Sequence, residues 1–293
     1  MSIIDFPNSP TVDDLFRVGD VTWRWNGTQW VGAYLPFSPD QIGGLRLWLD
    51  ASDANTMTLA SGAISEWRSK DANARAFTQA TPASRPTYGG TFQNGRQVAV
   101  FTSQWLVSTA AASVWKFLHD GAKHTLFLVV KAGLVANPDA RYDVISTGTV
   151  GAATISYTVL YDDRSAFSRD DAMALRVYNG TDVVAAATTP NSSVPANTFV
   201  LIRVDGDVGN GITADRGAIA VNGGTPTAVD VGTGTPSSSD PMSTLHIGVN
   251  GDGVSFPLRG GIAEALIYEG ELTAAQVAWS EQRLAAKWGI TLA

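Results

Sequence analysis

Short runs of β-favouring residues, separated by turn signals, recur along most of this chain. Turn signals include six Asn-Gly pairs, which supply the positive-φ residues of tight hairpins and begin at Asn26, Asn94, Asn179, Asn210, Asn222 and Asn250. Nine runs have strand composition: 45–49, 97–101, 125–131, 155–161, 174–178, 199–204, 218–221, 245–249 and 262–268. Because no helical periodicity separates them, they predict an all-β fold, an antiparallel β-sandwich or jelly roll.

Only two stretches have a helical pattern. Residues 109–119 place apolar side chains at helical spacing, but the segment is short. Near the C-terminus, Thr273 and Gln276 form a capping box, Val277, Leu284 and Trp288 share one stripe, and Gly289 stands where a helix commonly ends. We therefore expect a C-terminal helix beside the strands.

The first 31 residues contain three of the nine Trp. A two-residue Asn26-Gly27 turn predicts a β-hairpin in which Trp23 lies opposite Trp30, so that Val21, Trp23, Trp25 and Trp30 share one face. A two-stranded ribbon is marginal alone, so this face has to be covered by the chain's own body or by another protein. With residues 32–44 as a linker, we expect an N-terminal module over 1–40 and a β-sandwich over 41–293.

Charge and composition exclude several classes of function. The net charge of −7 argues against nucleic acid as a partner, and the absence of Cys excludes disulfides and thiolate metal sites. No basic and apolar leader opens the chain, and the longest apolar stretch, 126–130, is too short to insert into a membrane.

Catalytic patterns are missing as well. The five Glu do not form the Glu-x-Asp-x-x-Glu motif of jelly-roll glucanases, and no G-x-S-x-G elbow accompanies His119, His124 and His246. The sequence therefore predicts that the chain is not an enzyme. A depolymerase that uses Asp pairs brought together by folding remains an alternative.

Two kinds of binding site fit the residue inventory. Residues 205–211 offer Asp205, Asp207 and Asn210 as calcium ligands, although a plain hairpin loop is the first interpretation, and no other cofactor is expected. Carbohydrate docks on exposed aromatic side chains, for which the candidates are Trp105 and Trp115 in predicted loops, with Tyr142, Tyr161 and Tyr178 as weaker ones. A place in the core is the favoured interpretation of each, because large aromatics dominate β-sandwich cores.

Several segments resemble a known family. Residues 45–53, 64–71, 83–88 and 94–96 resemble the opening of the concanavalin A-like, laminin-G-like domains of bacteriophage structural proteins. Residues 261–268, 272–273 and 287–290 resemble their closing strand and helix, so the resemblance covers about 41–293. It implies a concanavalin A-like lectin domain, and no catalytic residue is carried over.

The N-terminus resembles the short aromatic segment that opens many phage tail-fibre and head-fibre proteins, through Phe6, Trp23, Trp25 and Trp30. The resemblance implies a fibre or spike subunit of a virion or gene-transfer particle, assembled in the bacterial cytoplasm. These residues would attach it to other particle proteins, the sandwich would bind host surface polysaccharide, and a homotrimer is expected. A capsid decoration protein without glycan binding is the structural alternative.

Overall fold

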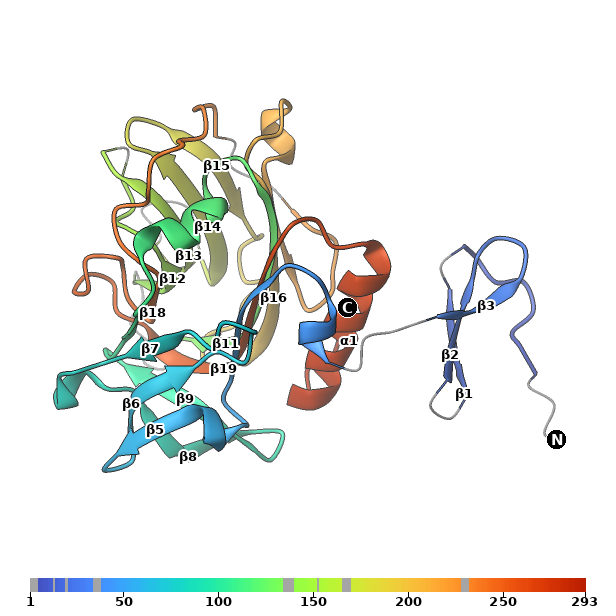
Figure 1. Ribbon diagram of the computed structural model, residues 1–293, viewed down its shortest axis with the longest axis horizontal. Helices are drawn as coiled ribbons and strands as arrows, with labels where there is room; N and C mark the ends of the chain where they lie inside the picture. Colours follow the sequence, from blue (N-terminus) through green and yellow to red (C-terminus); the bar gives the residue numbers. More distant parts are fainter. Residues whose placement is uncertain are drawn as a thin grey trace.

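The computed structural model describes residues 5–12, 14–18, 21–33, 38–133, 140–151, 153–164, 170–227 and 232–293. Its strands form two antiparallel sheets, a small N-terminal one and a large one that makes the main body (Figure 1). The small sheet has the order β1 (Leu15–Val18), β2 (Val21–Trp25) and β3 (Trp30–Ala33). The predicted all-β fold is thereby confirmed.

The large sheet has sixteen strands, and its two ends, β15 and β17, lie against each other, so that it nearly closes on itself. Its path runs through β15 (Val183–Thr188), β14 (Ala172–Asn179), β13 (Ile155–Asp162), β12 (Arg141–Ser146), β18 (His246–Ile247), β10 (Leu106–Ser108), β7 (Ala76–Thr78), β6 (Ala63–Arg68), β8 (Thr87–Gln93), β9 (Arg96–Thr102), β19 (Arg259–Glu269), β11 (Lys123–Ala132), β16 (Val200–Asp207) and β17 (Gly217–Val221). Off this path, β4 (Leu45–Asp50) pairs with β19, and β5 (Met57–Ala60) pairs with β6.

Every run predicted as a strand contains one, although β18 keeps only two residues of its run. One of the strands that the sequence pattern missed is β15, which has three consecutive Ala. Alanine has little β-propensity, so pairing with β14, rather than local preference, makes this segment a strand.

The Asn-Gly pairs lie in turns and loops, but the predicted two-residue hairpin forms at Asn94-Gly95 and not at Asn26 or Asn179, where the loops have four residues. Between β8 and β9, Asn94 and Gly95 adopt φ of 48° and 72° and form the expected two-residue turn. The loop after β2 has four residues instead of two, because the Asn26 side chain accepts hydrogen bonds from the backbone N–H groups of Thr28 and Gln29. Trp25 therefore pairs with Trp30. A shift of two residues leaves the side chains on the predicted face.

Helical structure is limited in the described residues. The expected helix over 109–119 is a 3-10 helix, η4 (Ala112–Leu118), and further single turns are η1 (Pro39–Gln41), η2 (Ala54–Thr56), η3 (Pro82–Ser84) and η6 (Thr213–Asp215). The C-terminal helix α1 (Ala274–Trp288) is confirmed, with the capping box at Thr273 and a left-handed Gly289 at φ 67°. It contacts β11 and β16. No helix in these parts of the chain is long and apolar enough to cross a membrane.

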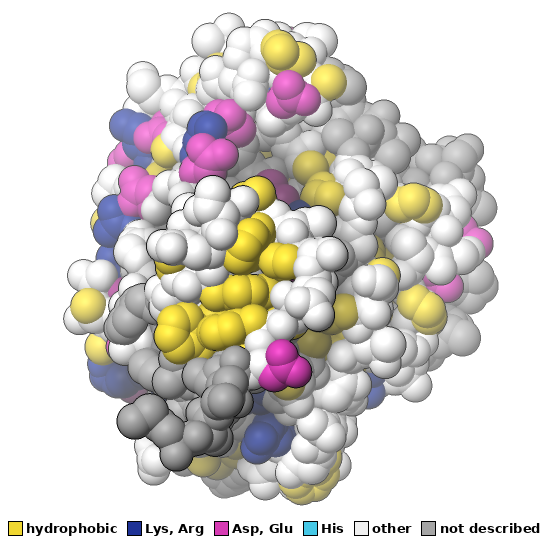
Figure 2. Space-filling view, turned by 90° about the vertical axis from the view of Figure 1, so that its right-hand side faces the viewer, with side chains coloured by type: hydrophobic (Ala, Val, Ile, Leu, Met, Phe, Trp, Pro, Cys, Tyr) yellow, Lys and Arg dark blue, Asp and Glu magenta, His cyan; other side chains and the backbone are white. Residues whose placement is uncertain are grey.

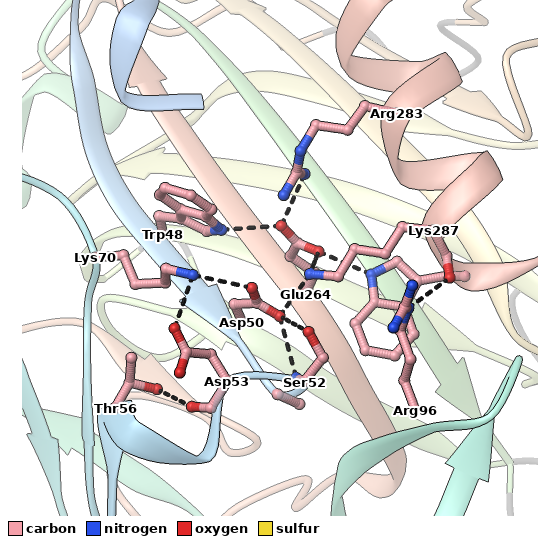
Figure 3. A network of polar contacts seen from close by, with 12 residues as sticks. Trp48, Asp50, Ser52, Asp53, Thr56, Lys70, Arg96, Glu264, Arg283 and Lys287 are labelled. Carbon is pink, nitrogen blue, oxygen red and sulfur yellow. Dashed lines mark hydrogen bonds and ion pairs between the residues drawn. The ribbon is translucent and has the colours of Figure 1, made fainter. Parts of the chain in front are cut away.

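A buried polar network attaches α1 to the sheet (Figure 3). The carboxylate of Glu264, on β19, accepts the indole N–H groups of Trp48 and Trp288 at 2.9 and 2.8 Å. It also pairs with Arg283 and Lys287 of the helix at 2.8 and 2.6 Å. Glu264 is fully buried, so water does not reach its charge. Two cations and two indole N–H donors compensate that charge instead.

A second carboxylate extends this network to the chain's first large strand. Asp50 lies opposite Glu264 in the β4–β19 register and binds Lys287 at 2.6 Å and Lys70 at 3.2 Å. Burial opposes its charge, but these two lysines hold the pKa of Asp50 below its usual value. Trp48, Asp50, Lys70, Glu264 and Lys287 all belong to segments that carry the family resemblance. Those segments therefore meet at a joint that holds the helix in place.

Candidate functional site

A pocket of 620 Å³ lies between the ends of β11, β16 and β17 and the first half of α1. Alternation along β16 sends Arg203, Asp205 and Asp207 to this outer side, while Gly206 lies on the inner side beneath His124. Lys123 of β11 and Glu281 of α1 complete the polar lining. We call this the helix pocket.

Ion pairs fix the charged groups of the helix pocket. Arg203 bridges the sheet and the helix, with Asp205 at 2.9 Å and Glu281 at 2.6 Å. Lys123 lies 3.5 Å from Asp207 and 2.7 Å from Glu271. These contacts hold several hydrogen-bonding oxygens in fixed positions around a concave surface, as ligand recognition requires.

Two carboxyls of the helix pocket have shifted titration. Burial raises the pKa of Asp205 although Arg203 opposes the shift. Burial also raises the pKa of Glu281, and the nearby charge of Asp205 adds to this effect. Acids with raised pKa values in a cleft are typical of binding and catalytic sites, where such groups exchange protons or hydrogen bonds with a ligand.

The calcium candidates divide between the helix pocket and its rim. Asp205 and Asp207 both line the pocket, but each already has a cationic partner in Arg203 or Lys123. Asn210 donates its side-chain N–H to Asp207 at 3.0 Å, and its backbone N–H closes a turn onto Asp207. The hairpin-loop interpretation accounts for these contacts, and calcium at these residues stays a prediction.

A different group of three carboxylates lies together in the described residues. One oxygen each of Asp163, Asp170 and Asp171 lies within 4.8 Å of the others. Burial and the charges of its two neighbours raise the pKa of Asp163, while Asp171 accepts the Tyr161 hydroxyl. The sequence signal for this group is the adjacent Asp170-Asp171 pair.

Most of the aromatic residues predicted to bind carbohydrate lie in the core. The prediction that Trp115 is exposed is wrong, because η4 turns it inward until its ring lies 6.1 Å from that of Phe77. Tyr142 and Tyr161 are buried neighbours on β12 and β13, with rings stacked at 6.0 Å. Trp105 and Tyr178 are partly exposed but lie outside the helix pocket. Large aromatics fill this sandwich, as they do most cores.

The N-terminal sheet has an aromatic cluster of its own. The Phe6 ring lies 5.3 to 5.5 Å from those of Phe16, Trp23 and Trp30, and Trp25 lies 5.7 Å from Trp30. All five side chains keep part of their surface exposed. Seen from the side of the N-terminal sheet, hydrophobic side chains form a continuous patch on the surface (Figure 2). Phe6, which precedes the strands, thus covers part of the predicted Trp face and leaves the rest accessible.

Comparison with known proteins relates this chain to others by fold alone. No family model and no curated protein matches its sequence. It is similar to Trypanosoma rangeli sialidase in complex with 2,3-difluorosialic acid, with TM-score 0.51 and 15% identity over 86% of this chain and 35% of that one. It is also similar to the binding domain of botulinum neurotoxin DC in complex with SialylT, with TM-score 0.50 and 9% identity over 83% of this chain and 52% of that one.

A third solved structure is more distant. The CBM40 of Ruminococcus gnavus IT-sialidase bound to α2,3 sialyllactose gives a TM-score of 0.40 and 15% identity, over 57% of this chain and 82% of that one. The chain spans about a third of the length of the first sialidase and about half of the toxin domain. The likenesses to the Trypanosoma rangeli sialidase and to the toxin binding domain support the β-sandwich fold.

The expectation that the chain is not an enzyme is corrected here. A solved structure that shares this fold over 86% of the chain is a sialidase, so membership of the fold does not separate binding proteins from enzymes. The missing glucanase motif excludes only one arrangement of carboxylates. The helix pocket, with Asp205 and Glu281 held by one arginine, offers another pair of acids.

Proposed function

We propose that the chain is a carbohydrate-binding appendage of a phage or gene-transfer particle, with the helix pocket as its glycan site. The observation that supports glycan binding is the helix pocket itself. Ion pairs join carboxylates and cations there, on the side of the sheet and on the side of the helix. Sugar hydroxyl groups both donate and accept hydrogen bonds, so preorganised carboxylates beside cations complement them well.

Fold and chemistry support this proposal from different directions. Two solved structures with the same fold are complexes, one with 2,3-difluorosialic acid and one with SialylT. Asp205 keeps 38% of its side chain exposed within the pocket, so a ligand reaches its carboxylate without displacing Arg203. Hydrolysis of a bound glycan in the same pocket is the alternative to binding alone. The experiment below measures binding and hydrolysis together.

We expect Asp205→Asn to weaken binding of the host's surface polysaccharide at least tenfold, because a carboxylate accepts stronger hydrogen bonds from hydroxyl groups than an amide does. The measurement is co-elution of the full chain with the purified polysaccharide, with polymer size followed by light scattering. Asp182→Asn is the matched control, since Asp182 is exposed and lies outside the pocket lining.

Each outcome of this experiment has a defined meaning. Co-elution that Asp205→Asn abolishes and Asp182→Asn leaves intact supports the glycan site, and a shortened polymer adds hydrolysis to binding. Equal co-elution of all three proteins places the glycan elsewhere. No co-elution of the wild-type chain removes the glycan function and leaves the decoration role.

We propose particle attachment for the N-terminal module. Its partly exposed aromatic cluster supports this, since an apolar face of a small sheet gains stability when a partner covers it. The position of the module in the virion, its assembly in the bacterial cytoplasm and the homotrimer expected from the family resemblance all stay predictions.

Trp30→Ser is expected to reduce incorporation into particles at least tenfold, because Trp30 contacts Phe6, Phe16 and Trp25 within the cluster. Quantifying copies per particle measures this. Trp105→Ser is the control, since it removes a partly exposed Trp from the sandwich. Normal copy number in the Trp30 variant would contradict attachment through this module, and a wild-type copy number near that of the shell protein would favour a decoration protein.

A further inference from the structure

A second pocket, of 450 Å³, opens at the other end of β11. Five parts of the chain contribute to it: the end of β8, the end of β11, the loop before β16, the turn after β17, and the segment after α1. Its described lining includes no carboxylate, although the chain as a whole carries a charge of −7. We call it the lysine pocket.

Lys131 supplies the charge of this pocket. Its Nζ lies 5.2 Å above the centre of the Phe199 ring, and among the described residues no carboxylate forms an ion pair with it. Burial lowers the pKa of Lys131, and no neighbouring charge contributes to that shift. A half-buried ammonium group of this kind gains most from an anion that enters the pocket.

The backbone holds the lysine and its aromatic neighbour together. Lys131 pairs with Gly261 of β19, and a Cβ at Gly261 would come within 3.0 Å of the Phe199 ring. Glycine at this position therefore leaves the space in which the ring lies beneath the ammonium group. On the neighbouring loop, Asn197 adopts φ 57° and donates its backbone N–H to Ala132 at 2.7 Å, which fixes this loop beside Lys131.

The rest of the lining suits a sugar ring. Phe92, at the end of β8, exposes 57% of its side chain. Gln93 donates its amide N–H to the Trp288 carbonyl and keeps its oxygen as an acceptor, while the Asn222 oxygen accepts the Leu201 N–H and its NH₂ group stays a donor. An apolar face, a donor and an acceptor thus surround one cation.

We propose that the lysine pocket binds the carboxylate of an acidic saccharide unit. Lys131 would pair with the carboxylate, Phe92 would lie against the apolar face of the ring, and Gln93 and Asn222 would bind its hydroxyl groups. A single ammonium group, without an arginine in the lining, matches a monoanion. This inference rests on the proposed glycan function, whose acidic ligand class it names, but it concerns a separate site.

The test compares two probes that differ at their carboxyl groups: a trimer of galacturonic acid and its methyl ester, in which each carboxylate is replaced by an uncharged ester. We expect the full chain to bind the acid at least tenfold more tightly than the ester in calorimetry, and Lys131→Gln to remove this preference. Phe92→Ala should weaken both probes about equally, and its exposed position makes it a safe variant for folding. Lys116→Gln, outside the linings of both pockets, is the matched lysine control and should leave the preference intact.

Glucuronate and N-acetylneuraminate serve as further acidic saccharides, and inorganic phosphate serves as a non-saccharide anion. The inference is overturned if acid and ester bind equally, if phosphate competes as well as the acids do, or if no acidic saccharide binds. Polysaccharide binding that depends on Asp205 would still support the helix pocket in that case. Loss of the acid preference in the Lys116 variant as well would also overturn it.

Discussion

Replacing Glu264 with Gln is expected to lower the free energy of unfolding by about 3 to 5 kcal/mol, the usual cost of breaking a buried ion pair. Two indole N–H groups, an arginine and a lysine converge on the two oxygens of this carboxylate. A glutamine has one acceptor oxygen. Its NH₂ group would face donors that the second carboxylate oxygen now accepts. At least one buried donor then has no acceptor, and the charges of the helix lose their partner.

Urea unfolding at neutral pH measures this effect. Glu271→Gln is the matched control, because 71% of that side chain is exposed and its pair with Lys123 lies at the surface, where such pairs contribute less than about 1 kcal/mol. A loss below 1 kcal/mol in the Glu264 variant would show that the network does not hold α1 on the sheet.

Acidification should destabilise the fold through His124, by about 2 kcal/mol at pH 5 and about 3 kcal/mol at pH 4. The ring is completely buried, its two nitrogens have no hydrogen-bond partner among the described residues, and burial lowers the pKa of His124 to about 4. Between about pH 6.5 and pH 4 the unfolded chain therefore binds a proton that the folded chain does not. This group's stabilisation is complete above pH 6.5 and is lost as the pH falls through that window.

The difference between the wild type and His124→Phe isolates this contribution, because the acidic groups that titrate nearby are common to both proteins. We expect the unfolding free energy of the variant to fall less between pH 7 and pH 4, by the amounts given above. Parallel pH profiles would mean that the ring takes up a proton without cost, and so that water or another acceptor reaches it in the folded protein.

The fold was predictable because its signals are local. Alternation, turn pairs such as Asn94-Gly95 and the capping box at Thr273 act within a few residues, and the structure confirms each of them. The exceptions at Asn26 and Asn179 are also local, since each side chain accepts two backbone N–H groups and widens its turn. Periodicity alone does not show whether a side chain will make such bonds.

The pockets were not predictable in the same way. Arg203 and Glu281 lie 78 positions apart and meet only because α1 packs on β16. In the same manner, Lys131 lies over the Phe199 ring because Gly261, on the strand beside it, leaves room for that ring. Asp205 and Asp207 are recognisable in the sequence as a loop pattern, but no local signal marks the cations beside them. Trp115 lies in the core, and composition alone does not distinguish an aromatic residue that lines a binding site from one that fills a core.

The joint around Glu264 has a consequence for how chains of this kind diverge. Trp48, Asp50, Glu264 and Lys287 are fastened to one another at that joint, and none of them lines the helix pocket or the lysine pocket. Substitutions in the linings of the two pockets can therefore accumulate while these four side chains stay in place. Two chains that share the joint would then share an architecture and still differ in the ligands that such pockets select.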